Sequence, residues 1–140
     1  MGTKKEYAGD GIVIGFEARR CIHAAECVRN LPAVFNSEKR PWIDAGGATA
    51  DEIVAVVERC PSGALTYERS DGGPREVATT RPTIRVGKDG PLFVRGSAVV
   101  DHEGNPLADG ARVALCRCGA SNNKPFCDNS HKTIEFDGGA

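Results

Sequence analysis

Sixteen residues near the C-terminal end of the chain read Cys116-Arg-Cys-Gly-Ala-Ser-Asn-Asn-Lys-Pro-Phe-Cys-Asp-Asn-Ser-His131. Cys116 and Cys118 are one residue apart, so both sulfurs can reach one metal centre. Cys127 and His131 then close the site from the far side of a tight loop. Three thiolates and one imidazole suit zinc or an iron–sulfur cluster, and they do not suit calcium or magnesium.

The spacing of this stretch, C-x-C-x2-S-x3-P-x-C-D-x-S-H, resembles the CDGSH iron–sulfur motif of the mitoNEET-like family. The resemblance covers roughly residues 82–136. It implies a [2Fe-2S] cluster with Cys116 and Cys118 on the inner iron and Cys127 and His131 on the outer iron. The alternative is a structural Cys3His zinc site, although zinc ligands are usually paired as C-x2–4-C rather than as C-x-C.

One position departs from the family motif, because Asn129 stands where C-D-G-S-H has glycine. A glycine there suggests a backbone with positive φ, and asparagine is one of the few other residues that tolerate this conformation. We expect Ser121, Asp128 and Ser130 to hydrogen-bond the cluster sulfurs or the ligand loop, a role that tunes potential. Asp128 is also expected to cap the short helical turn that carries His131.

The first half of the chain holds the other three cysteines, Cys21, Cys27 and Cys60, the last of which precedes a proline. A bacterial-type ferredoxin site has the pattern C-x2-C-x2-C plus a distant C-P, and in that frame the middle position is Ala24. This set resembles single-cluster [3Fe-4S] ferredoxins. Arg40-Pro-Trp-Ile43 is more similar to the divergent monocluster ferredoxin-like domains of the YjdI type, and the resemblance covers roughly residues 10–69.

The nuclearity of this first cluster stays open at the sequence level. Three cysteines without a fourth imply [3Fe-4S], whereas [4Fe-4S] would need His23, Glu26 or a small molecule on the fourth iron. Buried structural thiols are a further alternative, since free cysteine is commonly buried. A disulfide framework is disfavoured in a chain that we expect to be intracellular.

Length and composition indicate one domain or two very small ones. The chain has 140 residues, of which 40% are hydrophobic and only 6% aromatic, so its cores are thin. Bound clusters would therefore contribute much of the folding free energy. We predict an α+β fold with a small ferredoxin-like domain of the βαβ type at residues 10–69, a linker at 70–81 and a β-rich CDGSH domain at 82–136.

The predicted elements follow from hydrophobic periodicity and from turn and cap signals. In the first half we expect two paired strands at 11–17 and 64–68, a short helix at 24–30, and a longer helix that begins at the Thr49–Glu52 capping box and stops at Cys60-Pro61. In the second half, which begins with residues 83–86, we expect short strands at 92–95 and 98–100, and residues 112–115 lead into the cysteine-rich loop. Residues 1–10 are polar and are expected to be loose.

The net charge and the sequence motifs restrict the classes of function that we expect for this chain. The formal net charge is −1 with both signs interspersed, which argues against nucleic acid as a main partner. No apolar run approaches a membrane span, and we expect a soluble, cytoplasmic protein. Since no catalytic constellation is found, the chain is not expected to be an enzyme.

Two redox centres of different type on one small chain predict one-electron transfer with redox partner proteins of unknown identity. The alternative is a cluster donor or a redox or pH sensor, which passes the labile His-ligated [2Fe-2S] cluster to apo-protein acceptors. The mitochondrial relatives of the second half form homodimers. This chain could pair in that way, or its two halves could pack on each other.

Overall fold

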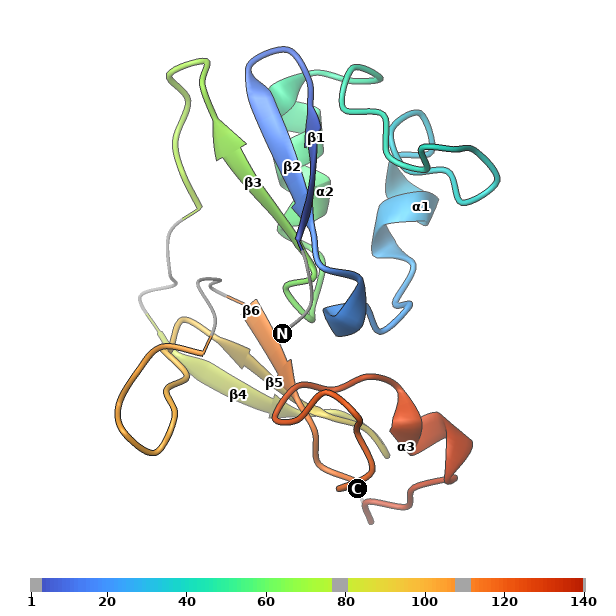
Figure 1. The fold of residues 1–140 in the computed structure, drawn as a ribbon, viewed down its shortest axis with the longest axis vertical. Helices are drawn as coiled ribbons and strands as arrows, with labels where there is room; N and C mark the ends of the chain where they lie inside the picture. Colours follow the sequence, from blue (N-terminus) through green and yellow to red (C-terminus); the bar gives the residue numbers. More distant parts are fainter. Residues whose placement is uncertain (1–3, 77–80, 108–111, 140) are drawn as a thin grey trace.

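The computed structural model describes residues 4–76, 81–107 and 112–139. Two halves lie one above the other in Figure 1, and each is built on a three-stranded antiparallel sheet, with the orders β1-β2-β3 and β4-β5-β6. The elements of the first half are β1 Lys5–Ala8, β2 Ile12–Phe16, η1 Ala18–Arg20, α1 Glu26–Asn30, α2 Ala50–Val57 and β3 Leu65–Arg69. Those of the second half are β4 Thr83–Val86, β5 Leu92–Arg95, β6 Arg112–Leu115 and α3 Ser130–Thr133.

The core of the first half lies between its sheet and α2. Ile12 and Ile14 of β2 are buried, as their alternation predicts, and Ile53 and Val57 bury the inner face of α2. The helix begins where the capping box predicts, since Thr49 Oγ accepts a hydrogen bond of 3.2 Å from the backbone N–H of Glu52. The predicted pairing of the two strands is confirmed as the antiparallel pair β2–β3.

The second half has a smaller core of its own. Val94 on β5 and Val113 on β6 face the same side and pack with Phe126. Leu115 ends β6 and forms an isolated bridge with Phe126. Strand β6 therefore leads directly into Cys116, and the returning segment of the cysteine-rich loop lies beside the end of β6.

Several expectations need correction. The structure is a small mixed fold that is nearly all-β rather than clearly α+β, because its helices have only five, eight and four residues. Within residues 1–10, positions 5–8 are not loose, because β1 completes the first sheet as an edge strand. No strand forms at 98–100, where Val100 makes only an isolated bridge to Pro106.

The predicted domain limits stay predictions. Part of the expected 70–81 linker, residues 77–80, lies outside the described residues, as do residues 1–3 of the predicted loose N-terminal stretch. Within the described ranges, no helix is long and apolar enough to cross a bilayer.

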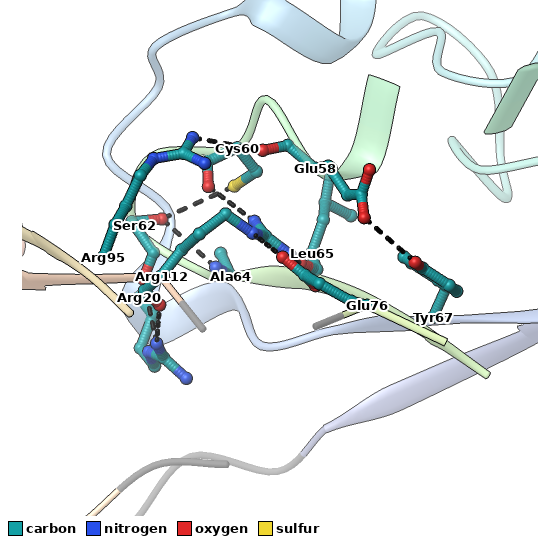
Figure 2. A network of polar contacts seen from close by, with 10 residues as sticks. All are labelled: Arg20, Glu58, Cys60, Ser62, Ala64, Leu65, Tyr67, Glu76, Arg95 and Arg112. Carbon is teal, nitrogen blue, oxygen red and sulfur yellow. Dashed lines mark hydrogen bonds and ion pairs between the residues drawn. The ribbon is translucent and has the colours of Figure 1, made fainter. Parts of the chain in front are cut away.

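The two halves pack on each other, and one buried arginine lies at the centre of their contact (Figure 2). Arg112 on β6 is 1% exposed. Its guanidinium forms two hydrogen bonds with the carboxylate of Glu76, at 2.8 and 3.1 Å. It also donates to the backbone carbonyls of Cys60 and Leu65 in the first half. The charge is thus paired, and its remaining donors are directed across the junction.

A second buried arginine, Arg20, reaches from the first half toward the second. Arg20 in the first half donates to the carbonyl of Arg112 at 3.2 Å and to that of Ser62 at 2.9 Å. Its guanidinium lies 4.9 Å from the ring centre of Phe126. Gly63 must be glycine here, because its φ is +74° and a Cβ would collide with the carbonyl of Arg112. Each half therefore contributes an arginine side chain that donates hydrogen bonds to backbone carbonyls of the other half.

We predict that Arg112→Met destabilises the protein by about 3–5 kcal/mol. The substitution leaves the carboxylate of Glu76 and the backbone carbonyls of Cys60 and Leu65 without their hydrogen-bond donor. Urea unfolding of the cluster-loaded protein would measure the loss. Arg29→Met is the matched control, because Arg29 lies on the exposed face of α1 and pairs only with neighbouring residues. Equal stability of the two variants would show that Arg112 does not hold the halves together.

Candidate metal centres

The four predicted ligands of the second half form two pairs. Cys116 Sγ lies 3.9 Å from Cys118 Sγ, and Cys127 Sγ lies 3.5 Å from Nδ1 of His131. Each pair has a separation that is compatible with two ligands on one iron, and the assignment of these four residues as ligands stays a prediction. The pairs also lie close enough for the charges of Cys116 and Cys118 to act on Cys127.

Backbone hydrogen bonds fold the loop so that these pairs meet. The N–H of Cys116 donates to the carbonyl of Pro125 at 2.7 Å, and the N–H of Cys127 donates to that of Ala114 at 2.9 Å. These two bonds align the outgoing and returning chain. Gly119, with φ of +82°, lies in the turn immediately after Cys118. The ligand geometry thus follows from a short closed loop on β6.

Backbone N–H groups point at the sulfurs. Gly119 donates to Cys116 Sγ at 3.3 Å, Ala120 to Cys118 Sγ at 3.4 Å, and Asn129 to Cys127 Sγ at 3.5 Å. Such donors stabilise thiolates, the form that binds metal. Every cysteine of this site therefore has a donor suited to a ligating sulfur.

The pKa values of these ligands differ in direction. Burial tends to raise the pKa of Cys116, but N–H donors from Ser121 and Gly119, the neighbouring thiol and the charge of Lys124 outweigh it and lower the pKa. Burial raises the pKa of Cys127, and the charges of Asp128 and the other two cysteines add to this. Burial and then the charge of Lys132 lower the pKa of His131, which favours the neutral ring that binds metal.

The three predicted supporting residues act mainly on the loop. Ser121 Oγ donates to the carbonyl of Phe126 at 2.6 Å. The carboxylate of Asp128 accepts from the backbone N–H groups of Asn122 and Ser130, at 2.9 and 3.0 Å. Asp128 thus caps the first turn of α3, although the residue at the cap position itself is Asn129. These bonds hold α3, and with it His131, against the cysteine loop.

Asn129 combines two properties. Its φ is +74°, so the predicted left-handed conformation is confirmed. Its side-chain Nδ2 donates a hydrogen bond of 2.7 Å to the carbonyl of Ile22, which directly follows Cys21. The residue that replaces the family glycine therefore links the loop of one cysteine site to that of the other. The sequence gives no signal for this bond, because it joins positions 107 residues apart.

Cys21, Cys27 and Cys60 lie around one small pocket in the first half. They come from three places, since Cys21 follows η1, Cys27 lies in α1 and Cys60 follows α2. The charge of Cys60 acts on both other thiols, so the three sulfurs are neighbours. Burial is the main cause that raises the pKa of Cys21, and it raises that of Cys27 to about 11. Bound iron would supply the positive charge that these buried thiolates need.

The candidates for a fourth ligand border the same pocket, together with Ala24 at the missing cysteine position. His23 is exposed, with φ of +55°. The carboxylate of Glu26 bonds Asn30 and Arg29 on α1, at 3.0 and 3.4 Å. The backbone N–H of His23 is directed at the sulfur of Cys21. The structure leaves the fourth position open between the side chains of His23 and Glu26.

We predict that Cys60→Ala removes only the iron and sulfide of the first site, about three or four iron atoms per chain, because the second site has its own four ligands. Cys127→Ala is the reciprocal variant and should remove about two. Iron and sulfide analysis after gel filtration would measure both. Unchanged iron in the Cys60 variant would contradict a metal centre in the first half.

Comparisons with known proteins match two segments of the chain, and each segment contains one of the two sets of residues. A family model described as a divergent 4Fe-4S mono-cluster matches residues 7–70, and one described as an iron-binding zinc finger of the CDGSH type matches residues 89–132. The uncharacterized protein YjdI of Escherichia coli strain K12 is 38% identical over 66 residues, which are 47% of this chain and 87% of YjdI. YjdI of Escherichia coli O157:H7 matches equally. The chain therefore belongs, through its first half, to the family of YjdI; its residues 7–70 are similar to divergent 4Fe-4S mono-cluster domains and its residues 89–132 to iron-binding zinc fingers of the CDGSH type.

Proposed function

We propose that this protein is a one-electron carrier that holds two iron–sulfur clusters. The observation that carries the proposal is that the loops of both sites meet at the junction of the halves. Ile22, which follows Cys21, is buried in one hydrophobic cluster with Cys127 and Ala114, and Ala24 packs against that cluster. Two centres in such neighbouring loops can exchange electrons within one molecule.

For the second half we propose a [2Fe-2S] cluster on Cys116, Cys118, Cys127 and His131. The arrangement in two pairs supports this assignment, because each iron of such a cluster takes two protein ligands. A single zinc ion would instead draw its ligands around one point.

For the first half we propose a [3Fe-4S] cluster on Cys21, Cys27 and Cys60. Three thiolates leave one corner without a protein sulfur, which Ala24 cannot replace. The alternative is [4Fe-4S], which the description of the matching family names. In that case the fourth iron would be bound by His23, by Glu26 or by a small molecule.

Bound clusters would supply reversible one-electron chemistry, and the residues around them would set the reduction potential. The N–H donors of Gly119, Ala120 and Asn129 withdraw charge from the sulfurs of the second site. The neutral imidazole of His131 replaces an anionic thiolate. Both effects favour the reduced state and raise the potential relative to an all-cysteine site.

Asn129 connects the two ligand sets through one hydrogen bond. Cys21 is bonded to Ile22, whose carbonyl accepts from Asn129, and Asn129 lies two residues from both Cys127 and His131. Asn123 adds a second link from the same loop, because its side chain donates to the carbonyl of Arg19 at 3.1 Å. These bonds keep the two loops in register.

A cluster donor is the second candidate. It is supported by His131, which is only partly buried and lines an open cleft, so the outer iron would be accessible. Under the carrier proposal the protein has no catalytic role, and it exchanges electrons with partner proteins. The cytoplasmic location and a homodimer stay predictions.

The deciding experiment is a redox titration of anaerobically purified protein, followed by EPR and by iron and sulfide analysis. We expect an oxidised [3Fe-4S] signal as isolated, a [2Fe-2S] signal after reduction, and unchanged iron through repeated cycles. Iron that moves to an added apo-ferredoxin during the cycles, and stays in place in His131→Cys, would instead favour the donor. Zinc without sulfide in native material would contradict both candidates.

Replacing Asn129 tests the connection between the clusters. Asn129→Gly keeps the positive φ and removes one inter-half hydrogen bond, which is worth about 1 kcal/mol. We expect full iron content and a weaker magnetic interaction between the two reduced or paramagnetic clusters in EPR. Asn122→Gly, at an exposed position of the same loop, is the control and should leave the interaction unchanged. An unchanged spectrum in the Asn129 variant would show that this bond does not position the clusters.

A further inference from the structure

A cleft with a volume of about 480 Å³ lies between the two halves. Ligand sites in proteins usually have volumes of about 300–1,000 Å³, so the cleft has the size of a small-molecule site. Both halves contribute walls, since Arg59 and Pro61 come from the first half and Arg85 and Lys88 from the second. The cleft therefore exists only because the halves are docked.

Positive charge dominates the walls. Five cationic side chains line the cleft, against one carboxylate, that of Glu26; the cations are Arg59, Arg85, Lys88, Arg95 and Lys132. The chain as a whole has a formal net charge of −1, so this concentration is local. Within the described residues none of the five forms an ion pair, whereas Glu26 is paired with Arg29.

Two of the cations are held in place by their neighbours. The guanidinium of Arg85 lies 4.4 Å from the ring centre of Phe93. Arg95 donates at 3.1 Å to the carbonyl of Glu58 across the junction (Figure 2). An arginine oriented in this way loses less rotamer entropy when it binds an anion.

The cleft also touches both metal centres. Ala24, at the missing cysteine position, lines it together with His131. Nδ1 of His131 faces Cys127, while its Nε2 edge lies against Gly90, which also lines the cleft. A molecule in the cleft would therefore lie beside the exposed ligand of the outer iron.

We propose that this cleft binds a small anion with two or more negative charges, carried by phosphate or carboxylate groups. Several unpaired cations around one concave site favour a multivalent anion over a monovalent one, because each added charge gains a further contact. This binding goes beyond the proposed electron transfer, since it requires the docked halves and not a change in redox state.

The test is calorimetric titration of the oxidised, cluster-loaded full chain with pyrophosphate and, separately, with citrate. The two probes distinguish phosphate from carboxylate chemistry. We expect saturable binding of at least one probe, with an affinity that falls as salt is added. Lys88→Gln and Arg59→Gln should each weaken it about fivefold, the factor that one solvated charge contact supplies.

Lys39→Gln is the matched control, because Lys39 is exposed and lies outside the cleft. It should leave the affinity unchanged. The EPR signals of each variant show that both clusters are retained, so a loss of binding is not a loss of the fold. No saturable heat with either probe, or equal affinity in all three variants, would overturn the proposal. Neither result bears on electron transfer, which the redox titration measures by itself.

Discussion

The buried guanidinium of Arg112 is the interaction on which the arrangement of this molecule depends. It lies on the strand that leads into the CDGSH-type loop, and it binds the carbonyl of Cys60, a cysteine of the other site. A buried arginine is tolerated only when its charge is paired, and Glu76 supplies the carboxylate. The position of one metal centre relative to the other is therefore set by a hydrogen-bonded network and not by a large apolar core.

Small size explains why such a network is needed. Each half has a sheet of three short strands, and among the residues that the structure describes the hydrophobic cluster between the halves has three buried members, Ile22, Ala114 and Cys127. Domains of this size bury little apolar surface, so polar contacts and bound metal contribute a larger share of the stability. Two of the residues that make these polar contacts lie close to cysteines in the sequence, since Arg20 precedes Cys21 and Asn129 is two residues after Cys127. The docking of the halves and the shaping of the sites thus use the same residues.

Much of the local structure could be predicted from the sequence. The strand at Ile12–Phe16, the helix opened by Thr49 and the left-handed conformation of Asn129 each depend on interactions within a few residues. Those interactions leave a pattern that periodicity and cap signals reveal. The edge strand β1 was missed because one of its faces is solvated and its residues are polar, so its pairing with β2 decides its conformation. The overestimate of helix has a similar origin, since the short turns α1 and α3 are limited by αL residues at their starts.

By itself, the sequence determined which residues of each half can act as metal ligands, because ligand type and spacing are local. It also determined the family resemblance of each half. Only the tertiary structure decided that the loops of the two sites meet, that Arg112 is buried rather than solvated, and that five cations from both halves line one cleft. These features join residues far apart in the chain, such as Asn129 and Ile22. No pattern along the sequence records such pairs, because they arise where the two sheets and their loops pack on each other.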